Sequence, residues 1–372
     1  MPGAIGSILQ PHVFRSVNMS VFVELEYRMP DLYRDFLGST CDLNGRSILI
    51  TGGTGSFGKE FVKIILQRCK PERIVIFSRD ELKQYEMAQE YSDHMYPCMR
   101  YFIGDVRDQQ RLEMAMQGID FVIHAAAMKH VAIAEYNPFE CVQTNIIGAE
   151  NVVRAALKAK VKRIVALSTD KAASPVNLYG ATKLASDKIF VAANNIRGNS
   201  DLRISVVRYG NVIGSRGSVV PLFRKILANG ATSIPITHPD MSRFWITLEQ
   251  GVNLVLSTLS DMKGGEIFVP KIPSMRVVDL ARVLAPHLPQ DIIGVRPGEK
   301  LHEVMITADD SRQTLEFHDR FAILPQVRFF DINPAEYAGA RPVVDGFTYS
   351  SDINTEWLDA EGCQALLVRA GA

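Results

Sequence analysis

Short apolar runs alternate with amphipathic segments through the first half of the chain. Runs such as 47–50, 73–77 and 161–166 are each followed by a segment with helical spacing of its apolar residues. Continuously apolar strands are typical of parallel sheets that are covered on both faces. This alternation predicts an α/β fold with a Rossmann-like, doubly wound parallel sheet. The expected strands are 47–50, 73–77, 101–103, 121–123, 161–166 and 204–207.

The regular alternation ends near residue 208. Gly, Pro and Ser interrupt 214–221 and 234–240, which predicts loops in both segments. Helical periodicity returns at 247–259, and 266–269 is typical of a strand that rejoins the main sheet. We therefore expect a smaller C-terminal lobe after residue 208.

The two ends of the chain follow neither pattern. A short helix is predicted over 23–37, and the pattern is weak beyond about residue 325. Met19 and Met29 leave open a later start, and the other interpretation is a surface or oligomer-contact arm. The predicted organisation is an N-terminal extension of undefined role at 1–41, a Rossmann domain at 42–208, a lobe at 209–330 and an uncertain C-terminal segment at 331–372.

Composition excludes several classes of protein. The chain is 47% hydrophobic and 22% charged with a formal net charge of zero, which is typical of a globular protein and removes the general argument for nucleic-acid binding. The sequence contains neither a run of about 18 apolar residues, as a membrane span requires, nor a signal-peptide pattern. The five cysteines are odd in number and widely spaced, which favours a reduced, cytoplasmic setting. Since the sequence contains no His/Cys cluster with metal-ligand spacing, we expect no metal.

A glycine-rich turn joins the first expected strand to the first expected helix. Its glycines, Gly52, Gly55 and Gly58, have the spacing G-x-x-G-x-x-G. Glycine allows a tight turn and a close backbone approach, and the helix N-terminus offers free N–H groups to a pyrophosphate. A lone glycine triplet could equally mark a simple tight turn, but its position between strand and helix favours a dinucleotide site. The expected contacts here are Gly52, Thr54, Gly55, Ser56, Phe57 and Gly58.

The ends of the following strands bear on which dinucleotide is bound. Ser78, Arg79 and Asp80 follow the second strand, where such proteins usually contact the adenosine ribose. Arg79 favours the 2′-phosphate of NADP, whereas Asp80 would favour NAD or cap the next helix. We predict NADP, with NAD as the alternative. The other expected cofactor contacts are Lys83, Asp105 and Val106 beside the adenosine, and Ala125 and Lys129 toward the nicotinamide.

A second motif supplies redox chemistry. Tyr179 and Lys183 are four residues apart and therefore share one face of a helix. A nearby ammonium and an oxidised nicotinamide favour tyrosinate, which can remove a hydroxyl proton during hydride transfer. Alone, this spacing usually marks an exposed helix face. After the glycine turn and the strand-end pair Ser168 and Thr169, it indicates a catalytic site.

The longer string around this motif resembles a known family. From Ser168 to Lys183 it is Ser-Thr-Asp-Lys-Ala-Ala-Ser-Pro-Val-Asn-Leu-Tyr-Gly-Ala-Thr-Lys, which is similar to the extended short-chain dehydrogenase/reductases and, in detail, to the inverting UDP-N-acetylglucosamine 4,6-dehydratases of pseudaminic acid synthesis. The resemblance spans roughly residues 43–325. It implies a homo-oligomeric hydro-lyase that oxidises C4, eliminates water across C5 and C6, and returns the hydride to C6 with inversion at C5. It also implies a role in flagellin glycosylation.

The resemblance further implies catalytic roles. Tyr179 is the base for the C4 hydroxyl, Lys183 tunes it and holds the ribose, and Thr169 orients the sugar. Lys171 removes the C5 proton and Asp170 protonates the departing C6 hydroxyl, roles that require shifted pKa values. The alternative interpretation of Asp170 and Lys171 is a surface ion pair of little energetic value.

Substrate contacts are implied in the same way. Cationic and amide side chains suit the diphosphate and uracil of a UDP-sugar. The matching positions are Lys129, Thr169, Asn211, Arg216, Arg243 and Arg296. For the three arginines, solvent exposure or internal ion pairing is the alternative, and Glu299 and His302 are either supporting or purely structural.

Two positions separate related activities. Retaining dehydratases carry Asp-Glu where this chain has Asp170 and Lys171, so the lysine favours inversion. Capsule-type relatives carry methionine where this chain has Tyr179. The alternatives to an inverting dehydratase are a retaining dehydratase, a 4-epimerase and a non-catalytic NADP-sensing module.

Overall fold

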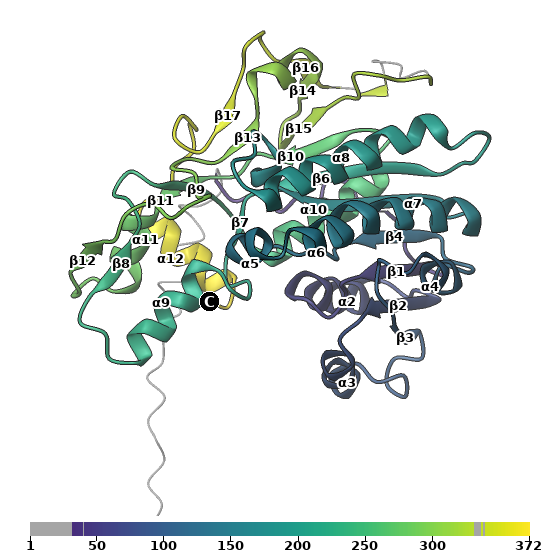
Figure 1. Cartoon of the computed structure of the whole chain (residues 1–372), viewed down its shortest axis with the longest axis horizontal. Coiled ribbons are helices and arrows are strands. Elements are labelled where there is room, and N and C mark those ends of the chain that lie inside the picture. Colours follow the sequence, from purple (N-terminus) through teal and green to yellow (C-terminus); the bar gives the residue numbers. More distant parts are fainter. Residues whose placement is uncertain (1–31, 40, 331–335, 338) are drawn as a thin grey trace, which may run out of the picture.

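A ten-stranded sheet forms the centre of the molecule in the computed structural model, which describes residues 32–39, 41–330, 336–337 and 339–372 (Figure 1). Its order is β16-β14-β15-β10-β6-β5-β4-β1-β2-β3. Seven neighbouring strands are parallel: β1 (Ser47–Thr51), β2 (Arg73–Ser78), β3 (Met99–Ile103), β4 (Phe121–His124), β5 (Arg163–Thr169), β6 (Arg203–Tyr209) and β10 (Ile267–Pro270). Three antiparallel strands extend the sheet: β15 (Arg320–Ile323), β14 (Thr314–Glu316) and β16 (Arg341–Pro342).

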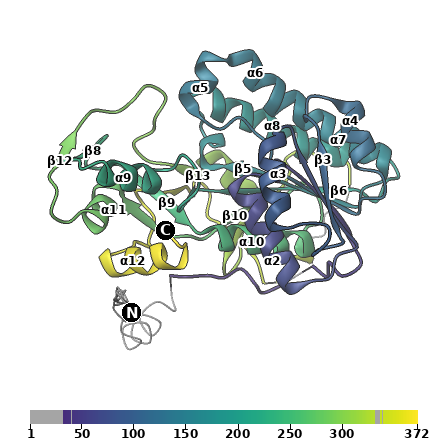
Figure 2. The ribbon, with the colours of Figure 1, turned by 90° about the horizontal axis from the view of Figure 1, so that it is seen from below.

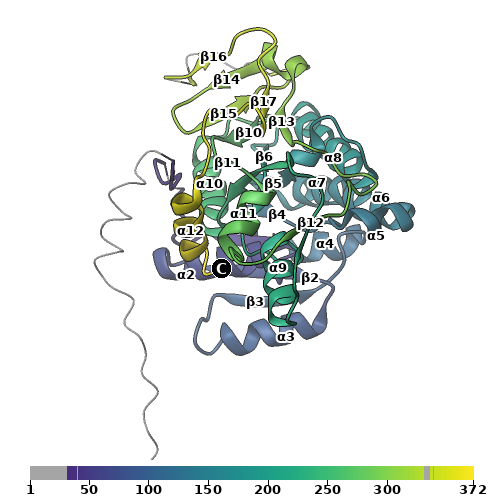
Figure 3. The same cartoon turned by 90° about the vertical axis from the view of Figure 1, so that its left-hand side faces the viewer.

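Helices cover both faces of this sheet (Figure 3). Contacts pair α2 (Ser56–Arg68) with α10 (Leu248–Asp261), and they join α7 (Gly148–Ala159) to α4 (Gln109–Ala115) and α8 (Leu178–Ile196). The β1 residues Ile48, Leu49 and Ile50 are fully buried between these layers. The doubly wound α/β fold predicted from the apolar strands is therefore confirmed. The remaining elements around this sheet are α3 (Glu81–Glu90), α5 (Val131–Tyr136), α6 (Pro138–Val142), the π-helical turn η1 (Gln143–Ile147) and the 3₁₀ turns η2 (Asp170–Ala172) and η3 (Ala308–Gln313).

A smaller lobe lies to one side of the main sheet (Figure 2). It contains a three-stranded sheet of β7 (Asn211–Val212), β9 (Ser242–Ile246) and β11 (Ser274–Arg276), and a pair formed by β8 (Ile234–Ile236) and β12 (Gln290–Ile292). Its helices are α9 (Val219–Ala228), α11 (Val277–Leu284) and α12 (Ala360–Arg369). A further pair, β13 (Val304–Ile306) with β17 (Tyr349–Ser350), ties the C-terminal segment back to the rest of the chain.

Three local predictions differ from the structure. The loop predicted over 214–221 includes the start of α9 at Val219, and the loop predicted over 234–240 contains strand β8, which pairs with β12. Proline and glycine suggested loops there, but a short two-stranded pair tolerates proline. The helix predicted over 23–37 falls mostly outside the described residues, and its described part, 32–37, is not helical.

The described part of the N-terminal segment is anchored to the C-terminal half of the chain. The Arg34 guanidinium donates two hydrogen bonds to the Glu356 carboxylate, at 2.6 and 2.7 Å, and a third to the backbone carbonyl of Lys271. Phe36 beside it is buried in the main core. Within the described ranges, no helix has the length and apolar character needed to cross a bilayer.

Candidate active site

A cleft of about 850 Å³ lies at the carboxyl ends of the parallel strands. The strand order reverses between β1 and β4, which is where doubly wound sheets bind ligands. Most residues predicted for the site line this cleft: Gly52, Thr54, Gly55, Ser56, Phe57, Ser78, Arg79, Asp80, Lys83, Asp105, Val106, Ala125, Lys129, Thr169, Asp170, Lys171, Tyr179, Lys183, Asn211 and Arg216. Gly58, Arg243 and Arg296 are not among the lining residues.

Glycine is required at two positions of the turn after β1 for different structural reasons. Gly52 has a φ of +65°, and a Cβ there would lie 2.9 Å from the Ala126 backbone. Gly58 lies in α2, where a Cβ would lie 2.2 Å from the Gly53 carbonyl oxygen. Gly58 therefore allows the helix to pack closely against the turn, and we assign it packing rather than cofactor contact.

Helix α2 begins at the cleft without a side-chain cap. Its N-cap is Gly55, and its first turn contains no acidic residue. Gly55, Ser56 and Phe57 all line the cleft. Free N–H groups and the positive end of a helix dipole are suited to a phosphate group. This turn therefore fits the pyrophosphate of the predicted dinucleotide.

The side chains at the end of β2 divide into a helix cap and an exposed cation. Asp80 accepts a hydrogen bond from the Lys83 backbone N–H at 3.0 Å and another from the Lys83 ammonium. These bonds lower the pKa of Asp80, and they support the capping interpretation of this residue. The Arg79 side chain is 59% exposed and lies 3.5 Å from Asp105. A cation is thus present where the adenosine ribose is expected.

Tyr179 and Lys183 lie near the start of α8. Asn177 caps this helix by accepting a hydrogen bond from the Gly180 backbone at 2.8 Å. Tyr179 is 8% exposed and Lys183 is 4% exposed. The Lys183 ammonium donates to the Leu167 carbonyl at 2.7 Å, so its position is fixed by the end of β5. The predicted redox pair therefore shares one buried helix face that opens on the cleft.

The ionisation of this pair is dominated by burial. Burial raises the pKa of Tyr179 to about 12, although Lys171 and the Thr169 hydroxyl pull it down. Burial lowers the pKa of Lys183, and Asp187 partly offsets that effect. The tyrosine is the neutral phenol at neutral pH, so the predicted tyrosinate needs an additional positive charge nearby.

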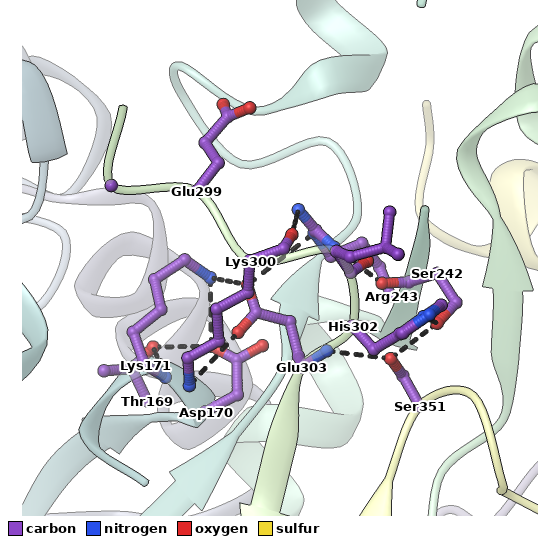
Figure 4. Close-up of polar contacts among 12 residues, drawn as sticks. Thr169, Asp170, Lys171, Ser242, Arg243, Glu299, Lys300, His302, Glu303 and Ser351 are labelled. Atoms are coloured by element: carbon purple, nitrogen blue, oxygen red, sulfur yellow. Dashed lines mark hydrogen bonds and ion pairs between the residues drawn. The ribbon is translucent and has the colours of Figure 1, made fainter. Parts of the chain in front are cut away.

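Asp170 and Lys171 form the turn η2 after β5 and meet Glu303 from the segment before β13 (Figure 4). The Lys171 Nζ lies 3.0 Å from Asp170 Oδ1 and 3.0 Å from Glu303 Oε1. Both carboxyl side chains are almost completely buried. The Thr169 hydroxyl also donates to Asp170 Oδ1, at 2.8 Å. The surface ion pair considered from the sequence is therefore wrong, because the pair is enclosed and has a third member.

The charges of this cluster shift one another. Burial and then Glu303 raise the pKa of Asp170, which favours its carboxylic acid form. Burial would lower the pKa of Lys171, but Asp170 and Glu303 outweigh burial and raise it. Burial opposes the charged form of Glu303, yet Lys171 and Arg243 hold its pKa below the usual range. The raised pKa of Asp170 suits the acid role predicted for it. A base role for Lys171 requires that it first lose a proton.

Residues near β7 bring a cation and an amide to the other end of the cleft. The Lys129 ammonium donates to the Arg216 carbonyl at 3.1 Å, and burial lowers the pKa of Lys129. The Arg216 backbone N–H donates to the Ser56 hydroxyl at 3.4 Å, which joins this loop to the glycine turn. Asn211 Oδ1 is buried without a hydrogen-bond partner among the described residues. These groups are placed to contact a polar ligand.

The other two predicted arginines lie outside the cleft lining. Arg243 is 8% exposed, donates to the Lys300 carbonyl at 3.0 Å and lies 3.6 Å from Glu303. Arg296 is exposed and lies 3.7 Å from Glu299. The structure thus favours internal pairing for Arg243 and exposure for Arg296, the alternatives that the sequence left open.

Two parts of the site were missed from the sequence. Glu303 contacts Lys171 only through the tertiary fold, and no local spacing connects them. Asp187 accepts hydrogen bonds from Ser168 at 2.8 Å and from Arg208 at 3.3 Å in a buried network. Its position four residues after Lys183, on the same helix face, is a signal that could have identified it.

The doubly wound sheet, the glycine turn and the Tyr179–Lys183 helix define the extended short-chain dehydrogenase/reductase fold. The profile of the family described as polysaccharide biosynthesis protein matches residues 48–325, and the chain belongs to this family.

The chain is similar to individual relatives that have different names. The chain is 61% identical over 320 residues, covering 84% of this chain and 95% of the relative, to a UDP-N-acetylglucosamine 4,6-dehydratase (inverting) of Campylobacter jejuni. It is 39% identical to a UDP-glucose 4-epimerase of Rickettsia canadensis over 87% of this chain and 95% of that protein. Among solved structures, Pen from Bacillus thuringiensis matches with a TM-score of 0.80 at 38% identity, covering 88% of this chain and 99% of that one.

Proposed function

We propose that this protein is an inverting UDP-N-acetylglucosamine 4,6-dehydratase. The observation that carries the proposal is the ion pair of buried Asp170 and half-buried Lys171 in the same cleft as Tyr179 and Lys183. Oxidation at C4 followed by elimination needs both a redox pair and an acid–base pair beside one sugar. The 61% identity to the Campylobacter jejuni enzyme of that name supports this assignment.

We further propose that residues 42–208 hold NADP and that residues 209–330 contribute mainly to substrate binding. The uncapped start of α2 would hold the pyrophosphate, and Arg79 would pair with the 2′-phosphate while Lys83 neutralises Asp80. When bound, the nicotinamide would accept a hydride from C4 of the sugar and return it to C6. Lys129, Asn211 and Arg216 would contact the UDP moiety.

In the first step, Tyr179 would take the proton of the C4 hydroxyl. Thr169 lies next to it and would orient that hydroxyl by hydrogen bonding, while the Lys183 ammonium would favour the phenolate. The product of this step is a C4 ketone, which acidifies the proton on C5. This prepares the sugar for elimination.

In the second step, the C5–H bond and the C6–O bond break. Lys171, as the free amine, would take the C5 proton, and the electron pair would form the C5–C6 double bond. Asp170, as the carboxylic acid, would protonate the C6 hydroxyl, which leaves as water. Return of the hydride to C6 together with reprotonation of C5 on the opposite face would give the inverted product, UDP-2-acetamido-2,6-dideoxy-β-L-arabino-hexos-4-ulose. Homo-oligomerisation and a place in pseudaminic acid biosynthesis and flagellin glycosylation are proposed from the family resemblance alone.

The product identifies the reaction. Purified protein is incubated with UDP-N-acetylglucosamine and NADP in deuterated water, and the sugar is assigned by NMR. We expect a 4-keto-6-deoxy sugar with inverted C5 that carries deuterium at C5. A product with retained C5 configuration indicates a retaining dehydratase. A 4-epimer with an intact C6 hydroxyl indicates the activity named for the Rickettsia canadensis relative, and cofactor binding without turnover indicates a non-catalytic module.

A further inference from the structure

We propose that Glu303 is a positioning residue that sets the orientation and charge of Lys171, and that Ser350 and Ser351 hold Glu303 in place. The proposal rests on the proposed dehydratase function, in which Lys171 acts on C5. It gives a role to a carboxylate that lies outside the cleft lining and to a C-terminal segment whose sequence showed no clear pattern.

The Glu303 side chain is enclosed by cations. It is 1% exposed, and its Oε1 lies 3.0 Å from Lys171 Nζ and 3.6 Å from Arg243 Nε. Its Oε2 lies 4.0 Å from Lys300 Nζ and has no hydrogen-bond partner in the described part of the chain. Because Glu303 does not line the cleft, it acts through Lys171 rather than by touching the sugar.

A second carboxylate changes what Lys171 can do. If Asp170 were its only acidic partner, the Lys171 ammonium would interact with Asp170 alone. It would then compete for the carboxyl group that must protonate the C6 hydroxyl. Glu303 approaches the same Nζ at an equal distance of 3.0 Å from a different element (Figure 4). Because two carboxylates contact Lys171 Nζ, the side chain of this lysine is held in one orientation. Asp170 Oδ2 is buried and has no hydrogen-bond partner among the described residues, so the contacts of Lys171 and Thr169 leave this oxygen unpaired.

The backbone of Glu303 is clamped by the C-terminal segment. Its N–H donates to the Ser351 hydroxyl at 2.9 Å, and the Ser351 N–H donates back to the Glu303 carbonyl at 2.8 Å. Ser350 adds a hydrogen bond to the same carbonyl at 3.3 Å. The Ser351 hydroxyl is also 2.7 Å from that of Ser242, which lies 2.8 Å from the His302 ring. Ser351 is fully buried, so these hydrogen bonds are shielded from water.

Burying the charges around Lys171 costs desolvation free energy, which indicates that this cluster has a role other than stabilising the fold. A buried ion pair is often no more stabilising than apolar residues of the same volume. The charges that face Lys171 are those of Asp170, Glu303, Arg243 and Lys300, and the Tyr179 side chain also lies beside it. Glu303 raises the pKa of both Asp170 and Lys171, so loss of its charge lowers both values.

Glu303→Gln tests the proposal because glutamine keeps the shape and removes the charge. We expect kcat to fall by about 10²-fold, because the loss of the Lys171 orientation outweighs its easier deprotonation. KM should change little, because binding of the sugar does not involve Glu303. C4 oxidation continues while elimination slows, so reduced nicotinamide accumulates and deuterium incorporation at C5 slows. The pH profile of kcat moves to lower pH, because loss of the Glu303 charge lowers the pKa of both Asp170 and Lys171.

Two further variants and a control complete the test. Glu303→Asp keeps the charge on a shorter side chain, and we expect a smaller loss of kcat with the pH profile unmoved. Ser351→Ala removes the hydroxyl that accepts the Glu303 N–H, and we expect kcat to fall a few-fold. Glu316→Gln removes a carboxylate that is paired with Lys271 at 2.7 Å outside the cleft, and we expect wild-type kinetics. Thermal unfolding and NADP binding are measured first for every variant.

The outcomes separate this inference from the proposed function. If the wild-type protein makes no 4-keto-6-deoxy sugar, the proposed function is wrong. If it does, wild-type kcat and C5 exchange in Glu303→Gln overturn the role of Glu303, and a lower kcat with an unmoved pH profile overturns its electrostatic part. Should Glu303→Gln fail to fold, Glu303→Asp decides: wild-type kcat in that variant contradicts positioning.

Discussion

The two ends of the cleft are built in different ways. The redox end uses residues that are close in sequence: the glycine turn belongs to one strand–helix unit, and Tyr179 and Lys183 are four positions apart on α8. The elimination end joins η2 to Glu303 and, behind it, to Ser351. Local spacing therefore encodes the part that the protein shares with many reductases, whereas the tertiary fold completes the part that distinguishes a dehydratase.

The two lysines of the cleft show the same contrast in their charges. Burial lowers the pKa of Lys183, with only Asp187 opposing it. Lys171 is subject to burial as well, but Asp170 and Glu303 reverse the effect and raise its pKa. Burial alone does not determine the ionisation of a lysine; its partners decide the direction.

Removing Lys171 is expected to break the elimination end most severely. In Lys171→Ala, dehydration falls by about 10⁴-fold, because neither the C5 base nor the group that organises Asp170 is present. NADP binding and C4 oxidation remain, so NMR detects no C5 deuterium exchange while reduced nicotinamide is seen by absorbance. Exchange at the wild-type rate would remove Lys171 from its proposed role. The NADP affinity of the variant serves as the control for folding.

Tyr179→Phe is expected to break the redox end. Dehydration falls by about 10³-fold, because the C4 hydroxyl loses its proton acceptor. This variant should show neither reduced nicotinamide nor C5 exchange, since elimination depends on the C4 ketone. Stopped-flow absorbance with saturating UDP-sugar distinguishes it from Lys171→Ala. Reduced nicotinamide at the wild-type rate would contradict the assignment.

Arg79→Ala should have the smallest effect, because it changes only cofactor choice. We expect NADP affinity to fall by about tenfold, or ~1.4 kcal/mol, since in our proposal the exposed Arg79 side chain would pair with the 2′-phosphate in a solvated position. NAD affinity is the internal control and should not change. Titration calorimetry measures both, and an equal loss for the two dinucleotides would argue against a 2′-phosphate contact.

The predictability of the molecule follows the same division. The apolar runs predicted the parallel strands to within three residues at each end, because a strand buried on both faces leaves a continuous signal. The strand β8 was missed because proline and glycine surround a short strand pair. The surroundings of Asp170 and Lys171 could not be predicted from the sequence either. An adjacent Asp and Lys can form an exposed ion pair or, as here, belong to an enclosed cluster with a third residue. Arg243 is the opposite case: the motif match predicted a substrate contact, whereas the structure places this arginine beside Glu303.

The clamp between Glu303 and Ser351 also concerns the order in which the protein is made. Translation delivers the chain from its N-terminus, and N-terminal regions generally fold first. The residues of the glycine turn and of α8 emerge well before residue 351. We therefore expect the nascent chain to be able to assemble its cofactor-binding half while Glu303 still lacks its clamp. A ribosome that stalls between these points would carry a chain that has its cofactor-binding residues but not the clamp on Glu303.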